Sequence, residues 1–570
     1  MNRRIHPMSH SSMALGETSC IAFHTSHFRL WSEKMIEIAK DSLTITDILT
    51  ATGGDLLSGS KSAAFSGVSI DSRTIRPGEL FWTLKGDRFD GHTFVNEVIT
   101  KGAAGAIVGP DFLPAITPAP DMNWPVDRVL IRVKDRTLAL QETARYLRRQ
   151  FPVPLVAITG SNGKTTTKEM IASIMACRGK VLKTEGNRNN LIGLPLTLFG
   201  LSADVKVAVL ELGMNAFGEI RRLTQICQPT IGLITNIGPA HIEFFGSLEK
   251  ISQAKGELFE EMRPDGVAII NGDDPYCLKM ASLRHRRLGD ERRTITFGLR
   301  EGADIRAQGI RQYEECVSFT LHADGKKVDV TLPLVGQINV YNALAAAAAA
   351  RALQIPLSVI QKGLSQVVLP PMRMMRLKGP NGSIIINDAY NANPVSMCSA
   401  IDVLVQSKRR GEPDRTGDPA RHSGKTESLC GTESLCGPEN PCGAGSPCGA
   451  GSPCGSGNPP AGGRAFLILG DMLELGADSE RFHRQVGWFV ANNPIDFLFT
   501  CGQAAHWIAE EALANGMKKD HVFYDLDHSQ IAETLKTLMA PGDRILIKGS
   551  RGARMEKVVN LLMDKGTSPT

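Results

Sequence analysis

The sequence predicts an α/β protein with three domains, and three observations support this. Short apolar runs bounded by turn residues alternate with helical stretches along most of the chain, a pattern typical of parallel sheets covered by helices. The chain has 570 residues, more than one hydrophobic core organises, and its 42% of hydrophobic residues can fill several cores. The runs fall into three groups, which we place at residues 35–135, 136–368 and 369–566.

The first group follows a leader, residues 1–34, that contains no continuous apolar stretch. The leader is either a disordered extension or the product of a wrongly assigned start codon, and it lacks the apolar segment of a secretory signal. From Leu43 to Val133, apolar runs such as GELFWTLKG, GAAGAIVG and RVLIRV alternate with turn signals. This pattern predicts a small α/β domain, and a helix is expected after it at 137–149.

The second and third groups each predict a mostly parallel sheet. The central group contains the buried-strand patterns PLVAITG, VKVAVLEL, TIGLITNI and GVAIIN, which are separated by helical stretches. The last group contains GSIIIND, AFLILGD, DFLFTCG, HVFYDL and RILIKGS. It predicts a Rossmann-like, doubly wound α/β domain.

A low-complexity insertion at 408–463 interrupts the third group. Five of the twelve cysteines recur there every six residues, at Cys430, Cys436, Cys442, Cys448 and Cys454. A tract this rich in Gly, Pro and Ser cannot bury much apolar surface, so we expect it to be disordered; a soft-metal site of tandem thiols is the alternative. The other seven cysteines form no CxxC pair, which suits a reducing compartment.

Charge and hydropathy exclude several classes of protein. The formal net charge of +5 is small for this length and does not indicate binding to nucleic acid or to a membrane surface. No apolar run reaches the roughly 18 to 20 residues of a membrane-spanning helix, because the Ala-rich run that starts at Ala343 ends at Arg351. We therefore expect a cytoplasmic protein with small-molecule partners, no nucleic-acid partner and no insertion into a membrane.

The strongest local motif is a glycine-rich turn between a predicted strand and a predicted helix. Backbone N–H groups of such a turn cradle phosphates, its lysine reaches the terminal phosphates, and its hydroxyl can bind Mg²⁺. The full P-loop pattern has glycine at position 158, where this chain has Ile158. We predict a variant P-loop that binds a nucleotide through Thr159, Gly160, Ser161, Asn162, Gly163, Lys164 and Thr165.

Two residues at the ends of predicted strands are candidate metal ligands. Glu211 ends the run VKVAVLE, at the edge of the sheet where a P-loop enzyme needs a carboxylate for magnesium. His241 follows TIGLITNI in a similar position. Taken alone, a histidine at such a position is more often structural than a metal ligand.

Longer motifs continue this pattern along the chain. TEGNRNNLIGLPLTL, ELGMNAFGEI, TNIGPAHIEFFGSLEKISQAKGELF and GQINVYNALAAAAAA follow one another in the order and spacing of the central domain of Mur ligases. DAYNANPVSM, GDMLELG and KGSRGARME resemble the member of this family that attaches D-alanyl-D-alanine. The chain is similar to Mur ligases over residues 42–562, apart from the insertion.

The resemblance implies ATP and Mg²⁺ as cofactors and a defined set of site residues. Lys164, Glu211, His241 and Lys255 are the implied catalytic residues; Lys255 would be carbamylated and, with Glu211, His241 and Thr165, would bind magnesium. Implied nucleotide contacts beyond the P-loop are Asn339, Asn342, Arg373 and Asp388, although Asn342 is equally compatible with a capping or core amide. Implied substrate contacts are Ser72, Arg73, Thr184, Asn187, Asn190, Tyr390, Asn391, Lys548, Ser550 and Arg551.

The reaction implied by the resemblance is ADP-forming amide synthesis. A monomer would join D-alanyl-D-alanine to UDP-muramoyl-tripeptide, in peptidoglycan synthesis and hence in cell-wall growth, shape and division. Alternatives are a Mur ligase that adds the third residue, a folylpolyglutamate synthase-like enzyme, an inactive nucleotide-binding scaffold and a P-loop switch. DAYNANP and the absence of Asp-Asn-Pro-Arg disfavour the first two, and Lys164, Glu211 and Lys255 disfavour an inactive copy.

Overall fold

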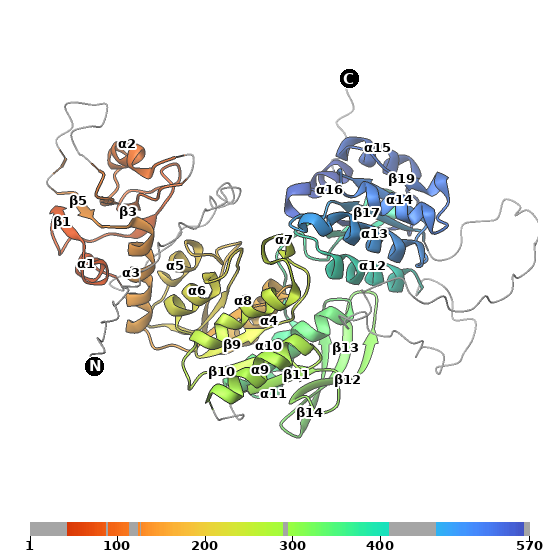
Figure 1. Cartoon of the computed structure of the whole chain (residues 1–570), viewed down its shortest axis with the longest axis horizontal. Coiled ribbons are helices and arrows are strands. Elements are labelled where there is room, and N and C mark those ends of the chain that lie inside the picture. The colour runs from red at the N-terminus through yellow and green to blue at the C-terminus, as the bar shows by residue number, and fades with distance from the viewer. Residues whose placement is uncertain are drawn as a thin grey trace, which may run out of the picture. The chain divides into compact units, whose positions relative to one another are not determined.

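The structure is a computed structural model that describes residues 43–86, 89–112, 124–125, 127–288, 294–409 and 463–563. The chain divides into two compact units, one ending at Leu140 and the other beginning at Gln141. The first unit contains one sheet and the second contains two (Figure 1). These three mostly parallel sheets confirm the predicted α/β class. The bounds predicted for the three domains stay predictions, and the leader at 1–34 and almost all of the insertion at 408–463 lie outside the described residues.

The first unit is built on a five-stranded sheet with the order β1-β5-β4-β3-β2. β1 pairs antiparallel with β5, and the other neighbours pair in parallel. The elements are α1 (Ile45–Thr52), β1 (Asp55–Ser58), β2 (Gly67–Ser69), β3 (Glu79–Trp82), α2 (Val95–Thr100), β4 (Gly105–Val108), β5 (Val129–Arg132) and α3 (Arg136–Gln150), which leads into the second unit. The helix expected at 137–149 is thus confirmed. Thr44 and Asp47 cap α1 with reciprocal hydrogen bonds.

A nine-stranded sheet begins the second unit, with the order β14-β13-β12-β11-β10-β9-β6-β8-β7. Its strands are β6 (Leu155–Thr159), β7 (Lys180–Lys183), β8 (Val205–Glu211), β9 (Ile231–Ile234), β10 (Val267–Asn271), β11 (Thr294–Gly298), β12 (Ile305–Gln312), β13 (Val317–Ala323) and β14 (Lys326–Leu332). Its helices are α4 (Lys164–Ala176), α5 (Gly193–Leu198), α6 (Glu219–Cys227), α7 (Ile242–Phe245), α8 (Leu248–Glu261), α9 (Pro275–Leu288), α10 (Gln337–Ala352) and α11 (Leu357–Ser365). The strands from β7 across to β12 pair in parallel, as predicted for this region.

β12, β13 and β14 form an antiparallel extension that the sequence analysis did not anticipate. Along β13, buried residues alternate with half-buried ones. This is the pattern of a strand with one face on the core and the other toward water. Continuous apolar runs, which predicted β6, β8, β9 and β10, do not reveal such a strand.

β6 occupies the point at which the chain changes direction across the nine-stranded sheet. From β6 the chain continues to β7 and β8 on one side, and then crosses to β9 on the other side. Open α/β sheets bind ligands beyond the carboxyl ends of their strands at such a point. The loop between β6 and α4, which carries the glycine-rich motif, is therefore in the position expected of a ligand-binding loop.

The Ala-rich run forms a core helix, α10. Residues 343–350 of this helix are at most 1% exposed, and α10 packs against α4. Small side chains allow this close approach, which brings residues at the start of α10 beside the glycine-rich loop. Among the described residues, no helix is long and apolar enough to cross a membrane.

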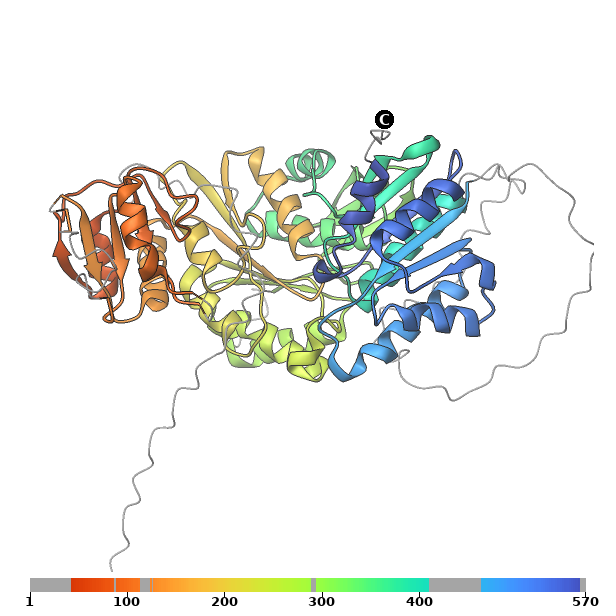
Figure 2. The same cartoon turned by 90° about the horizontal axis from the view of Figure 1, so that it is seen from above.

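The second sheet of this unit has six strands in the order β15-β16-β20-β17-β18-β19, and only β15 is antiparallel to its neighbour. Its strands are β15 (Met375–Lys378), β16 (Ile384–Asp388), β17 (Ala465–Gly470), β18 (Phe497–Cys501), β19 (Val522–Phe523) and β20 (Arg544–Lys548). Its helices are α12 (Pro394–Arg409), α13 (Ser479–Ala491), α14 (His506–Ala514), α15 (His528–Leu538) and α16 (Glu556–Met563). They lie on both faces of the sheet, as predicted for a doubly wound domain (Figure 2). α12 extends to Arg409, past the predicted start of the insertion at 408.

Candidate active site

The glycine-rich loop joins β6 to the first turn of α4. Two of its glycines have positive φ angles, 144° at Gly160 and 82° at Gly163. The Nζ atom of Lys164 donates a hydrogen bond to the carbonyl oxygen of Gly160 at 2.6 Å, so its side chain folds back over the loop. The first backbone N–H groups of α4 have no partner within the helix and carry its positive dipole end. The loop and helix start together form an anion site with a cation above it.

Replacing Gly163 with alanine is expected to weaken nucleotide binding and lower stability. Its φ of 82° costs an L-residue roughly 1–2 kcal/mol, and an added Cβ would lie 2.2 Å from Oδ1 of Asn342. Calorimetry and titration with a non-hydrolysable ATP analogue would measure a fall in Tm of roughly 2–5 °C and a loss of affinity. Gly218→Ala is the matched control, since Gly218 has a φ of 86° and no atom within 4 Å of an added Cβ. Equal behaviour of the two variants would show that crowding at Gly163 is unimportant.

Asn162 is held in the loop from three directions. Its backbone N–H donates to Oδ1 of Asn236 at 3.0 Å, and its carbonyl oxygen accepts from the Thr235 hydroxyl at 2.5 Å. Its side-chain Oδ1 accepts from Nδ2 of Asn393 at 2.7 Å. Thr235, Asn236 and Asn393 were not among the predicted site residues. All three lie within the motifs TNIGPAH and DAYNANP. The motifs therefore marked the right segments, although they did not reveal the roles of the individual residues.

Thr165 and Glu211, both predicted to bind magnesium, are in direct contact. The Thr165 hydroxyl donates to Oε2 of Glu211 at 2.8 Å and accepts from Nη2 of Arg373 at 2.9 Å. Nδ2 of Asn189, which was not predicted, donates to Oε1 of Glu211 at 3.2 Å. Burial alone would raise the pKa of Glu211, but the charges of Lys164, Lys168 and Arg373 outweigh it and lower the pKa. The carboxylate therefore stays charged, as a metal ligand must.

Lys255 is a buried lysine on α8. Its side chain is 1% exposed, and no carboxylate of the described residues lies within salt-bridge distance of its amine. Burial, reinforced by the positive charge of Lys164, lowers the pKa of Lys255 well below its usual value. Such a lysine carries a larger fraction of neutral, nucleophilic amine than a surface lysine does.

His241 precedes α7 with a left-handed φ of 62°. Its Nδ1 lies 2.6 Å from Oε2 of Glu474 in the GDMLELG motif. This contact does not have the geometry of a hydrogen bond, and Nδ1 has no hydrogen-bond partner among the described residues. The contacts of the described chain join Glu211 to Thr165, but they join neither His241 nor Lys255 to Glu211.

Asn339 and Asn342 lie at the start of α10, and both are 4% exposed. Nδ2 of Asn339 donates to the carbonyl oxygen of Val335 at 2.8 Å. Asn342 donates to Oδ1 of Asn339 at 3.2 Å and accepts from the Thr167 hydroxyl at 3.3 Å. Of the two interpretations left open for Asn342, this geometry favours a core amide that holds α10 beside α4.

Most of the site residues predicted in the part of the chain that forms the second sheet lie close to one another. The guanidinium of Arg373 stacks over the ring of Tyr390 at 4.0 Å. Nζ of Lys548 lies 2.6 Å from Oδ2 of Asp388 and donates to the carbonyl oxygen of Asn391 at 2.9 Å. The lysine side chain is only 4% exposed. Its N–H donors are thus largely used within the protein. This favours a role for Lys548 in holding the DAYNANP loop rather than in binding a substrate directly.

Ser550 and Arg551 differ in what they can offer a ligand. The Ser550 hydroxyl donates to the carbonyl oxygen of Ala392 at 3.2 Å and accepts from the backbone of Leu473 at 2.9 Å. Arg551 pairs with Glu556 at 3.1 Å and its side chain remains 37% exposed. Arg551 is therefore the more accessible of the two for a substrate carboxylate.

The Asn-rich loop after β7 contains three predicted substrate contacts. Thr184 is 1% exposed, and its hydroxyl and carbonyl groups are both engaged within the protein. Oδ1 of Asn190 accepts hydrogen bonds from the first residues of α5, including Gly193 at 2.9 Å. Asn187 is half-buried. This geometry favours an anchoring role for Thr184 and a capping role for Asn190, and leaves Asn187 as the better candidate for substrate contact.

In the first unit, the predicted residues Ser72 and Arg73 follow β2. The Arg73 guanidinium binds the Asp71 carboxylate at 2.6 Å, which lowers the Asp71 pKa, and its side chain is 68% exposed. Ser72 is buried, and its carbonyl oxygen accepts from Lys101 at 2.8 Å. The Arg73 side chain is thus the more available of the two.

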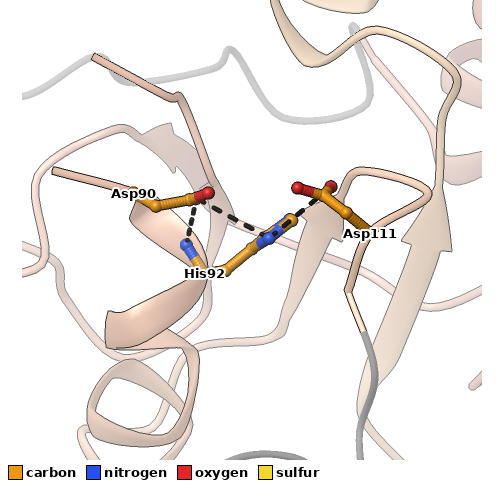
Figure 3. A group of neighbouring side chains, drawn as sticks. All are labelled: Asp90, His92 and Asp111. Atoms are coloured by element: carbon orange, nitrogen blue, oxygen red, sulfur yellow. Dashed lines mark hydrogen bonds and ion pairs between the residues drawn. The ribbon is translucent and has the colours of Figure 1, made fainter. Parts of the chain in front are cut away.

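Asp90, His92 and Asp111 meet in the first unit with a metal-like arrangement (Figure 3). Nε2 of His92 accepts a hydrogen bond from the backbone of Gly109 at 2.9 Å, so Nδ1 carries the proton and faces the two carboxylates. The guanidinium of Arg136 lies 2.6 Å from Asp90 and 4.0 Å from Asp111. The Arg136 guanidinium already supplies positive charge to both carboxylates, and the neutral His92 ring turns its Nδ1–H toward them, so the protein itself provides partners for the cluster.

The predicted magnesium nucleotide fits the residues around the glycine-rich loop. Oγ1 of Thr159, Nδ1 of His241 and Nε of Arg373 are buried and have no hydrogen-bond partner in the described part of the chain. Such atoms are rare in folded proteins, and phosphate oxygens or metal-bound water would satisfy them. The hydroxyl of Thr165 and the carboxylate of Glu211 are the hard oxygen donors that Mg²⁺ prefers.

Comparison with known proteins gives matches along most of the chain. Residues 64–148 match the Mur ligase family catalytic domain, residues 158–350 the Mur ligase middle domain, and residues 457–551 the Mur ligase glutamate ligase domain. UDP-N-acetylmuramoyl-tripeptide--D-alanyl-D-alanine ligase of Bacillus subtilis (strain 168) is 34% identical and aligns over 88% of this chain and 94% of its own. The protein of that name from Escherichia coli (strain K12) is 33% identical, over 92% and 99%.

Solved structures of MurF are also similar to this chain. A crystal structure of MurF from Acinetobacter baumannii has a TM-score of 0.72 and 30% identity, covering 92% of this chain and 99% of that one. MurF ligase from Thermotoga maritima in complex with ADP has a TM-score of 0.66 and 26% identity, covering 88% and 97%.

Proposed function

This chain belongs to the Mur ligase family, and on that premise we propose that it joins D-alanyl-D-alanine to UDP-N-acetylmuramoyl-tripeptide at the expense of ATP. It is an ADP-forming amide ligase of peptidoglycan precursor synthesis. The relatives named for this reaction align over almost their entire length, which supports the choice of substrates. The contact of Thr165 with both Glu211 and Arg373 carries the catalytic part of the proposal, because it joins the P-loop, a carboxylate and a cation that lies just before β15 at one point.

In the reaction, a carboxylate oxygen of the tripeptide attacks the γ-phosphorus of ATP and ADP leaves. The amine of D-alanyl-D-alanine then attacks the acyl carbon, phosphate leaves, and the nitrogen loses a proton as the amide forms. Lys164 and Arg373 offset the charge of the transferring phosphoryl group, and the loop backbone orients it. The described site residues thus act by positioning and electrostatics.

We propose that Thr165, Glu211, His241 and a carbamylated Lys255 hold magnesium. The bound metal supplies positive charge for the phosphates. The depressed pKa of buried Lys255 supports carbamylation, because the neutral amine is the form that adds to carbon dioxide. The resulting carbamate carries a negative charge, which the nearby charge of Lys164 favours.

We propose that the remaining predicted residues divide between substrate contact and support of the loops. Arg73, Asn187 and Arg551 have the accessible polar groups suited to substrate, whereas Ser72, Thr184, Asn190, Asn391, Lys548 and Ser550 are better placed to hold those loops. Tyr390 supports Arg373 by stacking. We also propose a cytoplasmic monomer that serves cell-wall growth, shape and division, as the family resemblance implied.

The decisive assay is ATP consumption by the purified full-length chain with UDP-muramoyl-tripeptide. D-alanyl-D-alanine, single amino acids, and folate with glutamate would be supplied in turn, the last without the tripeptide. Turnover only with D-alanyl-D-alanine supports the proposal. Turnover with a single amino acid or with folate and glutamate would instead identify a different amide ligase, and no turnover with any of them would favour an inactive copy.

Deletion of residues 411–461 is expected to change turnover by less than about twofold, because every residue proposed for the site lies outside this segment and a Gly/Pro-rich tract contributes little buried surface. Rates and Tm would be measured for the deletion variant and the full chain, with and without zinc. A zinc-dependent loss of Tm on deletion would contradict this expectation and favour metal binding by the cysteine repeat.

A further inference from the structure

Lys168 is a buried cation that the proposed mechanism does not use. It lies on α4, one turn after Lys164, and is 1% exposed. Its Nζ donates to the carbonyl oxygen of Thr184 at 2.6 Å and lies 3.0 Å from Oε1 of Glu169. Burying an ammonium group is unfavourable unless it is paired and hydrogen-bonded, so these two partners fix its position.

Thr184 is the residue at which the Asn-rich loop leaves β7. Its backbone N–H donates to the carbonyl oxygen of Val209 at 3.1 Å, and its hydroxyl accepts from the backbone N–H of Glu211 at 2.9 Å. The carbonyl oxygen of Thr184 accepts from Lys168. The start of the loop is thus tied to β8 by two hydrogen bonds and to α4 by the third.

The far end of the same loop returns to Glu211. Nδ2 of Asn189 donates to Oε1 of Glu211 at 3.2 Å, and the carbonyl oxygen of Asn189 accepts from the backbone of Gly213 at 2.8 Å. The 184–190 loop therefore contacts Glu211 twice, at the backbone through Thr184 and at the carboxylate through Asn189. The first of these contacts is made by the residue whose carbonyl oxygen Lys168 binds.

We propose that Lys168 is a positioning residue that fixes the 184–190 loop against Glu211. The muramoyl-peptide site and the nucleotide site are thereby held in a fixed position relative to each other. The identity of the peptide substrate at this loop rests on the proposed function. Lys168 contacts neither substrate in this arrangement and acts through Thr184. Its charge also helps to hold the pKa of Glu211 low, beside the charge of Lys164.

Lys183 provides a matched control. Its Nζ lies 2.5 Å from Oε2 of the same Glu169, but its side chain is 38% exposed, against 2% for Lys168. A general loss of ion pairing at Glu169 would therefore follow from either substitution. Only Lys168→Met removes the hydrogen bond to Thr184.

The test compares Lys168→Met and Lys183→Met in the full-length chain by hydrogen exchange and steady-state kinetics. We expect the amides of Glu211 and Gly213 to exchange about tenfold faster or more in Lys168→Met, because a buried charge-assisted hydrogen bond is lost. The KM for UDP-muramoyl-tripeptide should rise by a similar factor, and binding of a non-hydrolysable ATP analogue should change less than about threefold. Lys183→Met should leave all three quantities near wild type.

Unchanged exchange at Glu211 and Gly213 in Lys168→Met, or an equal change in Lys183→Met, would overturn the inference. Faster exchange across the whole unit would also overturn it, because it would indicate general destabilisation. If Lys168→Met does not fold, Lys168→Gln, which keeps a donor without the charge, takes its place and should show a smaller local effect. A wild-type chain without turnover on UDP-muramoyl-tripeptide would refute the proposed function, while the exchange comparison would still decide the role of Lys168.

Discussion

Replacing Lys255 with alanine is expected to reduce turnover by roughly a hundredfold or more, and acetate or formate at high concentration is expected to restore part of it. Lys255 lies on α8 with 1% exposure and has a strongly lowered pKa. A carbamate at this position would give magnesium an anionic oxygen ligand. Alanine removes that ligand and leaves a space that a small carboxylate can enter.

Two further variants distinguish the carbamate proposal from other roles of Lys255. Lys250→Ala, on the same helix but at an exposed position, should keep normal turnover and show no response to acetate. Lys255→Arg keeps a cation but cannot form the carbamate. If Lys255 acts as a cation, the arginine variant should be active and added anions should not rescue the alanine variant.

Near-normal turnover of Lys255→Ala at saturating magnesium would refute the carbamate proposal. So would a crystal structure of active enzyme that shows an unmodified amine with no metal nearby. Intact mass is a weaker measurement, because a carbamate forms reversibly with dissolved carbon dioxide and can be lost on the way to the detector. The rescue assay and the crystal structure therefore decide the question together.

The central elements of the site could be predicted because they depend on local sequence. A buried strand, a glycine-rich turn and a helix place Thr165 at the edge of the sheet, and a second buried strand delivers Glu211 to the same edge. Their 2.8 Å contact follows from the order of the strands. In the central sheet β6, β8, β9 and β10 were found for the same reason, since each is a continuous apolar run, whereas β7 and β12, which also pair in parallel, are not such runs and were missed.

The remaining contacts are pairings between distant segments, which no local pattern specifies. Asn393 and Asn162 are separated by 231 positions, and Arg373 and Thr165 by 208. Motif resemblance placed Arg373 and the DAYNANP segment near the nucleotide, but hydrogen-bond partners depend on how the sheets pack. The same limit applies to Lys548, because its ion pair with Asp388 could not be predicted from the KGSR motif.

Replacing Lys164 with alanine is expected to reduce phosphate release by on the order of a thousandfold while the fold is kept. Within the described part of the chain, Lys164 donates to carbonyl oxygens of its own loop, those of Gly160 and Ser161, which water can satisfy when the side chain is gone. Burial lowers the pKa of Lys164, and the charge of Glu211 offsets this only in part. ADP and phosphate formation would be measured beside circular dichroism and Tm.

The size of the expected loss follows from what the site contains. Phosphoryl transfer spreads negative charge over the γ-phosphate oxygens, and among the described residues Lys164 in the loop and Arg373, just before β15, are cations placed to offset it. Lys164→Arg keeps the charge but replaces a compact ammonium group with a planar fork, so it should recover little activity at a site shaped for a point charge. Binding of an ATP analogue should weaken far less than turnover falls, because the loop backbone still contacts the phosphates. Equal losses in binding and turnover would show that Lys164 acts mainly in binding, and unchanged turnover would remove the P-loop assignment.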